Sequence, residues 1–461
     1  MKRERAAERF RDTVDQARRR LALGLAAGLA AAAAPRLADA APGGLGAEAA
    51  GLKPGAGGDQ SRAFARALER AAREGRPLTL APGVYRAARI ALPEGAAIVG
   101  VPEMTRIELS EPGPLFTGKG LRRVAMRGLL LDGSNLPGGL QAGLIQLEDV
   151  AAFAFDELAI EDAGGSGLAL FRSGGALRGS RIANARQSGL FAMDGRGITV
   201  ADNVIRGCRN NGVVIRRTAK GDDGAVVSRN RIEDTGALDG GLGWNGNAVN
   251  VSKASGVVVS GNAIRRSAFT AVRAHESSDV VIADNLCLDC GETGLYVEYG
   301  FSGAVVSGNL VDGAANGVSI ANFNEGGRLA AVTGNVVRNL FRRKHLDRPG
   351  EGYGQGIGVE ADVAVTGNVI ENAASFGVHA GWGPYMRDVA ISGNIVRNCE
   401  VGIGVSVVEG VGPATIVGNT VTGSRKGAVV GYRWADAATP DLGSAGSGGL
   451  PGLTVAQNTV R

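Results

Sequence analysis

The sequence predicts an all-β fold: a single-stranded right-handed parallel β-helix, or solenoid, with an N-terminal capping α-helix. Three observations carry this prediction: a long internal repeat, short apolar runs that alternate with small or polar residues inside each repeat, and one amphipathic helical segment directly before the first strands. Glycine is abundant, with 74 of 461 residues, and aromatic residues make up only 5%, which favours many tight turns over a large aromatic cofactor cavity.

The repeat reads V-x-V-S/T-G-N-x-I/V, followed by a few polar residues and then G-V-x-V. Its asparagine returns at positions 203, 230, 262, 285, 309, 335, 368, 394, 419 and 458, with gaps of 27, 32, 23, 24, 26, 33, 26, 25 and 39 residues. A base period of this size is typical of leucine-rich repeats and β-helices. Val and Ile alternate with polar residues where a leucine-rich repeat needs a comb of leucines, so each repeat is two or three short strands stacked on the next repeat.

The recurring Gly-Asn pair is predicted to shape one turn of every coil. Glycine accepts the positive φ of the bend, and the asparagine amide stacks on the amides of neighbouring coils. We expect a structural role for this row rather than substrate contact. Three cysteines, Cys208, Cys290 and Cys399, share a row of small residues, and Cys287 takes an aliphatic position, so we interpret all four as core residues, with a disulfide within one coil as the alternative.

Residues 59–75 read as the capping helix. Asp59 is an acidic N-cap, apolar residues follow at helical spacing, and Gly75 ends the segment. Such a helix covers the apolar end of a solenoid, which is otherwise an aggregation-prone edge. At the other end, residues 439–450 are predicted to form a flexible loop before a final strand at 453–456.

The first forty residues predict a twin-arginine signal peptide. Arginines at 18–20 precede an apolar run over 21–34, and small residues at 38–40 provide a cleavage site. The apolar run has 14 residues, which is too short to span a bilayer. We therefore expect no stable membrane insertion after the leader is removed. General secretion is the alternative route, and either route leads to the periplasm or the outside of the cell.

The domain organisation that follows is a twin-arginine signal peptide at 1–40, a linker at 41–58 and a β-helix domain at 59–461, with the Tat translocase as a partner during export. The leader carries nine of the 50 Lys and Arg residues and five of the 45 Asp and Glu residues, which leaves 41 basic and 40 acidic groups in the mature part. This near-neutral balance argues against nucleic acid as a partner.

The predicted helix, the segment Leu78-Thr-Leu-Ala-Pro-Gly-Val-Tyr85 and the stacked Ser/Thr-Gly-Asn coils resemble the pectin-lyase-like superfamily of right-handed parallel β-helix proteins. Together with the leader they resemble, over nearly the whole chain, a bacterial family of twin-arginine-translocated repeat proteins of uncharacterised function. The resemblance implies the pectin-lyase-like fold and a periplasmic address. It supplies no agreed catalytic residues, so none are carried over.

Three adjacent coils concentrate side chains capable of chemistry. Strand alternation places Val272, Ala274, Leu295 and Val297 inside and the intervening residues outside. Insertions at 235–247, containing Trp244, and at 340–355, containing His345 and Tyr353, are expected to wall a groove beside them. The candidate catalytic residues are His275, Glu298 and Tyr296, and the candidate substrate-binding residues are Asn250, Ser252, Lys253, Arg273, Glu276, Tyr299, Glu360, His379 and Trp244.

This mixture suits carbohydrate, because sugar sites combine an aromatic plane with Arg or Lys for a uronate and with a carboxylate or His for proton transfer. The alternative is a solvated sheet face with cross-strand pairs. Two functions stay open: a scaffold that binds polysaccharide or cell-envelope glycan, and a lyase, epimerase or hydrolase of uronate-containing glycans. In the enzyme, Arg273 or Lys253 would neutralise a uronate, and Glu298 or Glu276 would assist His275 or Tyr296.

No metal or cofactor is expected from the sequence. Cys287-Leu-Asp-Cys290 has no second cysteine pair to complete a zinc site, and histidine occurs only at 275, 345 and 379. Asp222-Asp223 resembles the acidic pair of calcium-dependent lyases, but the flanking Gly221 and Gly224 favour a polar turn. Calcium therefore stays an open alternative.

Overall fold

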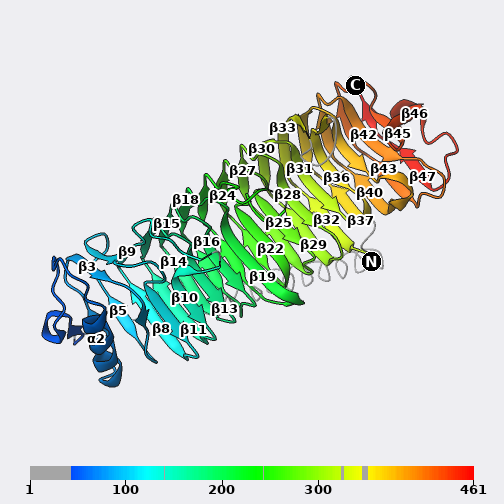
Figure 1. Cartoon of the computed structure of the whole chain (residues 1–461). Coiled ribbons are helices and arrows are strands. Elements are labelled where there is room, and N and C mark those ends of the chain that lie inside the picture. The colour runs from blue at the N-terminus through cyan, green and yellow to red at the C-terminus, as the bar shows by residue number, and fades with distance from the viewer. Residues whose placement is uncertain (1–42, 140, 242, 323–325, 345–350) are drawn as a thin grey trace, which may run out of the picture. The chain divides into compact units, whose positions relative to one another are not determined.

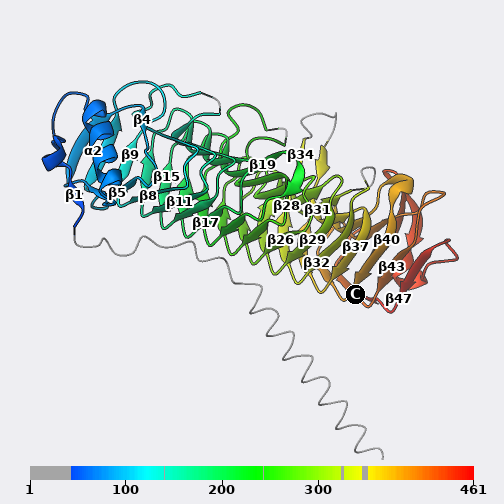
Figure 2. The same ribbon diagram turned by 90° about the horizontal axis from the view of Figure 1, so that it is seen from below.

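The computed structural model describes residues 43–139, 141–241, 243–322, 326–344 and 351–461, and these form a right-handed parallel β-helix of about 14 turns (Figures 1 and 2). This confirms the predicted fold. Each turn contributes one strand to each of three sheets, which we name A, B and C in the order that the chain visits them. The signal peptide predicted at 1–40 lies outside the described residues.

Each sheet stacks its strands along the solenoid in chain order. Sheet A contains β1 (Leu45–Gly46), β2 (Leu78–Thr79), β5 (Ala97–Val99), β8 (Arg123–Arg127), β11 (Ala152–Asp156), β14 (Gly175–Arg178), β17 (Thr199–Ala201), β20 (Val226–Ser228), β23 (Val258–Ser260), β26 (Val280–Ala283), β29 (Ser302–Ser307), β32 (Arg328–Thr333), β37 (Ala361–Thr366), β40 (Arg387–Ser392), β43 (Ala414–Val417) and β47 (Leu453–Ala456). Sheet B contains β3 (Gly83–Ala87), β6 (Thr105–Leu109), β9 (Leu130–Asp132), β12 (Ala159–Glu161), β15 (Arg181–Ala183), β18 (Val204–Arg206), β21 (Arg231–Glu233), β24 (Ala263–Arg265), β27 (Leu286–Leu288), β30 (Leu310–Ala314), β33 (Val336–Leu340), β38 (Val369–Ala373), β41 (Ile395–Arg397), β44 (Thr420–Thr422) and β48 (Thr459–Val460). Sheet C contains β4 (Ile90–Ala91), β7 (Phe116–Lys119), β10 (Gly143–Glu148), β13 (Ser166–Phe171), β16 (Ser188–Met193), β19 (Asn211–Asp222), β22 (Val249–Ser255), β25 (Val272–His275), β28 (Thr293–Glu298), β31 (Asn316–Ala321), β36 (Gln355–Val359), β39 (Phe376–Ala380), β42 (Val401–Ser406), β45 (Val429–Arg433) and β46 (Asp436–Asp441).

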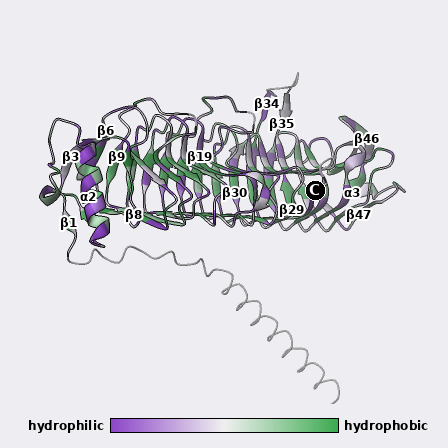
Figure 3. Cartoon of the chain, turned by 60° about the horizontal axis from the view of Figure 1, so that its bottom comes forward, coloured by the Kyte–Doolittle hydropathy of each residue, from purple (hydrophilic) through white to green (hydrophobic). Residues whose placement is uncertain are grey.

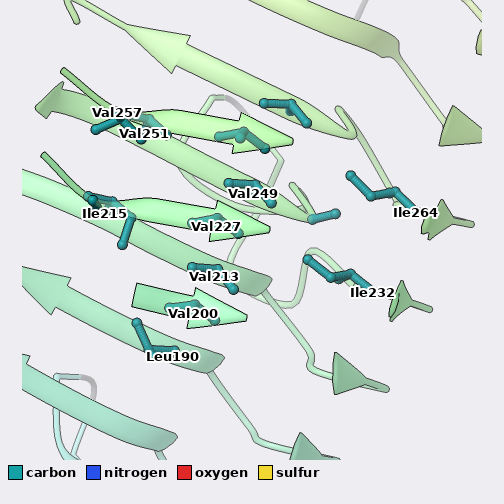
Figure 4. Packing of buried hydrophobic residues seen from close by; sticks show 14 of the residues in the cluster. Leu190, Val200, Val213, Ile215, Val227, Ile232, Val249, Val251, Val257 and Ile264 are labelled. Carbon is teal, nitrogen blue, oxygen red and sulfur yellow. The ribbon is translucent and has the colours of Figure 1, made fainter. Parts of the chain in front are cut away.

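The hydrophobic core is a set of columns that run along the solenoid axis. Neighbouring coils pair like with like, as where Ile232 pairs with Ile264 in sheet B and Val213 pairs with Val249 in sheet C. All four of these side chains are fully buried. Figure 4 shows this stacking, and Figure 3 shows apolar strand segments recurring along the described coils. Period-two alternation fixes which side chains enter the core, so it also fixes which ones face outward.

The asparagine row forms a continuous hydrogen-bonded ladder at the turn between sheets A and B. From Asn230 to Asn458, each amide oxygen of the row accepts the backbone N–H and the Nδ2–H of the preceding asparagine, as at Asn309, which accepts from Asn285 at 2.9 and 3.0 Å. The residue before each asparagine has a left-handed backbone conformation, for example Gly308 with φ 66°. The structural role predicted for the Gly-Asn pair is therefore confirmed.

Replacing Asn309 by alanine is expected to lower the free energy of unfolding by about 1–3 kcal/mol, because buried donors of Asn285 and the carbonyl of Ile282 lose their partner. Urea unfolding of the purified protein measures the loss. Asn372→Gly is the control: the Asn372 side chain is exposed and donates to Asn339 at 3.0 Å, and glycine accepts the φ of 56° at this position, so the change should stay within about 0.5 kcal/mol. Equal losses in the two variants would contradict a special role for the ladder.

The N-terminal end is covered by helix α2 (Ser61–Arg73), which buries Phe64, Leu68 and two alanines. The helix contacts strands of all three sheets, β2, β3 and β4, so it crosses the end of the solenoid as predicted. It begins two residues later than Asp59, whose carboxylate accepts the Ser61 N–H at 3.0 Å.

The predicted linker at 41–58 needs correction in its described part. Strand β1 pairs with β2, and the 3-10 helix η1 (Glu48–Ala50) follows it. Leu52 is fully buried in the core, together with Leu45 and Ala47. This segment therefore belongs to the solenoid end, because these three side chains complete the apolar surface beneath α2.

The C-terminal excursion is more ordered than the flexible loop predicted at 439–450. β46 pairs antiparallel with β45, and a short helix, α3 (Leu442–Ala445), follows and buries Leu442. The final strand at 453–456 is confirmed as β47. The four cysteines are free and buried, as their interpretation as core residues requires.

Candidate functional site

The strand register of sheet C confirms the predicted outward columns. The inward neighbours, such as Val272 and Leu295, are fully buried. Two columns result across β22, β25 and β28: Asn250, Arg273 and Tyr296 form the first, and Ser252, His275 and Glu298 form the second. The predicted alignment of these six positions is therefore confirmed.

Four of the predicted residues, Arg273, His275, Glu276 and Glu298, form what we name the charged cluster. Glu298 Oε1 accepts hydrogen bonds from Arg273 Nε and from His275 Nδ1, both at 2.7 Å. The other imidazole nitrogen, Nε2, lies 2.9 Å from Glu276 Oε1. Glu298 is 1% exposed and Glu276 is 38% exposed, so the imidazole connects a buried carboxylate with one that faces solvent.

Glu298 is held in its ionised form. Burial acts to raise the pKa of its carboxyl, but the His275 hydrogen bond and the Arg273 charge outweigh burial, and the pKa lies below its usual value. Tyr296 lies under the Arg273 guanidinium, with 5.0 Å between the guanidinium carbon and the ring centre. Burial and the nearby Glu298 charge raise the pKa of Tyr296, so its hydroxyl stays protonated and can donate but not act as a base.

The insertion at 235–247 lies against this cluster and changes the role expected for Asn250. Asn250 Nδ2 donates to the carbonyls of Trp244 at 2.9 Å and Gly243 at 3.3 Å. Asn250 is 1% exposed, so it holds the insertion in place and cannot touch a bound polymer. Ser252 is also 1% exposed, and its predicted substrate contact is wrong for the same reason.

Trp244 itself faces the surface and is 49% exposed. Its ring lies beneath the Arg216 guanidinium carbon at 4.2 Å and 5.8 Å from the His275 ring. The His275 ring centre also lies 5.1 Å from the ring centre of Tyr299. The imidazole therefore sits between two exposed aromatic side chains from different parts of the chain.

Lys253, Glu276 and Tyr299 occupy one turn of three successive coils, directly after the aligned strand positions. All three have a positive φ, of 59°, 50° and 63°. The same conformation occurs at Asp149 and Arg172 in the corresponding turn of earlier coils, so it belongs to the fold and marks no strain specific to the site. Lys253 thus lies one coil from Glu276 at the edge of the charged cluster.

A cleft of about 770 Å³ begins at Tyr296 and Tyr299 and continues along sheet C towards the C-terminal end. Its floor between Tyr296 and His379 consists of Ser319 and Gly358, which stand in the same column. Small side chains there leave the hollow open. The six strands from β28 to β45 that carry the cleft span about 24 Å at the usual strand spacing.

Aromatic side chains are concentrated in this cleft although they are rare in the chain. Four of the six tyrosines and two of the three tryptophans line it, together with Phe376. Trp382 and Trp434 are 39% and 49% exposed, and their ring centres lie 5.7 Å apart. The aromatic lining residues are Tyr296, Tyr299, Tyr353, Phe376, Trp382, Tyr432 and Trp434. We name the cleft with this lining the aromatic groove.

The wall towards sheet B is built by an antiparallel hairpin, β34 (Arg342–Lys344) and β35 (Glu351–Tyr353). Arg342 pairs with Glu400, which also pairs with Lys426 Nζ at 2.5 Å. Burial acts to raise the pKa of Glu400, but the Lys426 and Arg342 contacts lower it overall. The predicted insertion at 340–355 therefore walls the groove with Tyr353, whereas its His345 lies outside the described residues.

Glu360 and His379 line the aromatic groove and not the charged cluster. Glu360 Oε2 accepts the backbone N–H of Asn322. His379 stacks on Phe376 with 4.4 Å between ring centres. Burial lowers the pKa of His379 to about 4, so its imidazole is neutral near pH 7.

Lowering the pH from 6.5 to about 4 is expected to destabilise the protein partly through His379. The unfolded chain takes up a proton at the ordinary histidine value, but the folded chain does so only near pH 4, so stability falls across this window. Urea unfolding at several pH values should show a smaller loss for His379→Gln than for the wild type. An unchanged pH dependence would contradict this assignment.

Several groove residues were not singled out from the sequence: Arg342, Phe376, Trp382, Glu400, Lys426, Tyr432 and Trp434. Most lie in turns or in the C-terminal excursion, where strand alternation gives no direction. Trp434 packs over the turn at Gly383, where an added Cβ would lie 2.5 Å from the indole ring. One feature of the sequence could have indicated these residues: tryptophan and tyrosine are rare in the chain, and most of them occur after residue 290.

Within the described ranges, no group of three or more His, Cys, Asp or Glu side chains is placed to hold a metal ion. Asp223 is buried beside Arg217 at 3.6 Å, whereas Asp222 is exposed, so the two carboxylates do not share a site. No helix among these residues is both long and apolar enough to cross a membrane.

Comparison with known proteins supports the fold. No curated protein sequence matches the chain significantly. The pre-mature gene product 12 of bacteriophage phi29 superimposes with a TM-score of 0.60 at 13% identity, over 86% of this chain and 58% of that one, so this chain spans less than two thirds of its length. An N-terminal fragment of the same phage protein gives 0.53 at 15% identity, over 84% and 68% of the two chains.

The catalytic unit of a GH87 α-1,3-glucanase from Streptomyces thermodiastaticus strain HF3-3 gives a TM-score of 0.44 at 15% identity, over 92% of this chain and 70% of that one. At their low identities, the two phage superpositions show likeness of fold alone. Residues 143–339 match the family model described as the right handed beta helix region. By the parallel strands stacked in its three sheets, the chain is a right-handed parallel β-helix protein in fold.

Proposed function

We propose that the protein is exported to the periplasm or beyond, through the Tat translocase, and binds polysaccharide or cell-envelope glycan in the aromatic groove. The observation that carries the proposal is the convergence of seven aromatic side chains on one cleft of about 770 Å³, in a chain that is 5% aromatic. Aromatic planes beside a few convergent polar groups suit sugar rings, which present apolar faces and hydroxyl edges. The floor of Ser319 and Gly358 gives a chain of sugars room to lie along the solenoid.

The polar groups of the groove fit a ligand with hydroxyl groups. Glu360 and His379 line the groove, and so do the ion pairs of Arg342, Glu400 and Lys426. A neutral His379 can both donate and accept a hydrogen bond. The ion pairs keep both signs of charge at the wall, so a neutral glycan and a sparsely charged one are both accommodated.

A glycan array tests binding directly, using the mature protein with and without calcium. Retention of at least one polysaccharide, weakened by a soluble oligosaccharide of the same sugar, is the expected result. No binding to any envelope or matrix glycan would refute the proposal. Fractionation of the producing cell tests export: the protein should appear outside the cytoplasm, and Lys replacements of the arginines at 18–20 should retain it inside.

A second candidate is a glycan-active enzyme with the charged cluster as its acid–base site. The favouring observation is the His275 imidazole, which a buried carboxylate orients at one nitrogen and which reaches the surface at the other beside the groove end. Arg273 is engaged by Glu298, so Lys253 is the better candidate to neutralise a uronate. Polymer turnover that His275→Ala abolishes, with glycan binding retained, would establish this function; binding without turnover would exclude it.

A further inference from the structure

Two outward rows of sheet A carry no charged side chain on the last ten strands, from β17 to β47. The rows run along these strands from Thr199 to Thr454 and from Ala201 to Ala456. All twenty positions in the two rows are Val, Ala, Thr or Ser. Charged residues such as Asp362 and Asp388 stand at the second position of their strands, along one border of this face.

Sheet B shows that the repeat itself allows charge at such positions. In the same coils its outward row holds Glu233, Arg265 and Arg338, among others. A solvated β-sheet face normally carries charged residues, because they keep it soluble and prevent association. The difference between sheets A and B is therefore a property of the face and not of the fold.

The uncharged face has the size and shape of an interface. Val305 is 40% exposed at its middle, beside a shallow hollow of about 380 Å³ lined by Val281 and Ala331. Ten strands span about 43 Å, and the three residues from one row to the other span about 10 Å, so the two uncharged rows cover roughly 400 Å². With the charged border included, six residues per strand as in β37 and β40 span about 20 Å, so the whole face reaches at most roughly 800 Å², the area per partner of a standard specific interface.

We propose that a second copy of this chain covers the face, with sheet A packed on sheet A about a two-fold axis. An uncharged face is complementary to itself in either direction, because no like charges meet. Small and β-branched side chains let two sheets pack at about 10 Å, with the charged border forming a polar rim. Dimerisation through sheet A leaves the aromatic groove on sheet C open in both copies, so this proposal is independent of the proposed function.

Sedimentation equilibrium of the mature protein tests the proposal. The wild type should be a dimer that dissociates on dilution, and Val305→Lys should shift it to monomer by placing two like charges in the interface. Val336→Lys is the matched control: it stands on an outward row of sheet B, is 37% exposed, and should leave the dimer intact.

Ala364→Lys provides a second variant, because Ala364 stands in the same outward row of sheet A as Val305. Thermal unfolding verifies that each variant is folded. A wild type that is monomeric at every concentration would overturn the proposal. So would a dimer that both sheet A variants leave intact, because the interface would then lie elsewhere on the solenoid.

Discussion

Glu298→Ala is expected to lower the free energy of unfolding by about 3–5 kcal/mol, because it leaves the Arg273 guanidinium buried without its counter-charge. Arg273 is 12% exposed, so water cannot replace the carboxylate, and His275 loses the acceptor of its Nδ1. Urea unfolding at neutral pH measures the loss. The matched control is Glu157→Ala, whose carboxylate pairs with Arg127 at the surface; such exposed pairs contribute about 0–1 kcal/mol.

Acid should narrow the gap between the wild type and Glu298→Ala. The pKa of Glu298 lies below the ordinary value of 4.5 in the folded protein, so the unfolded chain takes up its proton first as the pH falls. The stability that Glu298 contributes is thus full above pH 4.5 and is lost as the pH falls through its folded pKa. A gap that stays constant into acid would contradict the ionised state assigned to this carboxyl.

The fold could be predicted because stacking is repetitive. The asparagine row marks the same turn in ten coils, and alternation then assigns every strand residue a direction. Arg273 and His275 were aligned correctly with Tyr296 and Glu298 for this reason. Strand alternation did not predict the role of Asn250. Alternation gives the direction of a side chain but not what covers it, and the insertion that contains Trp244 covers Asn250.

The aromatic groove could not be predicted from strand alternation, for a related reason. Trp382 and Trp434 stand outside the strands, beside η2 (Gly383–Tyr385) and between β45 and β46, where no period applies. Only the fold of these turns brings the two indoles together. The predicted site was centred on β25 and β28, whereas the aromatic groove begins at β28 and extends towards β45.

Replacing Trp382 and Trp434 together by alanine is expected to weaken glycan binding at least about a hundredfold. An aromatic side chain whose ring face is covered by the bound ligand contributes about 2 kcal/mol or more to the binding free energy. Titration calorimetry with the glycan identified on the array measures the change. Phe341→Ala is the control, since Phe341 is 42% exposed, comparable with Trp382, but does not line the groove. If the double variant binds as the wild type does, or if Phe341→Ala weakens binding equally, the sugar lies elsewhere on the solenoid. If binding falls only in the double variant while its unfolding in urea is unchanged, the loss comes from the two indole planes themselves, and the groove on sheet C is where the polymer lies.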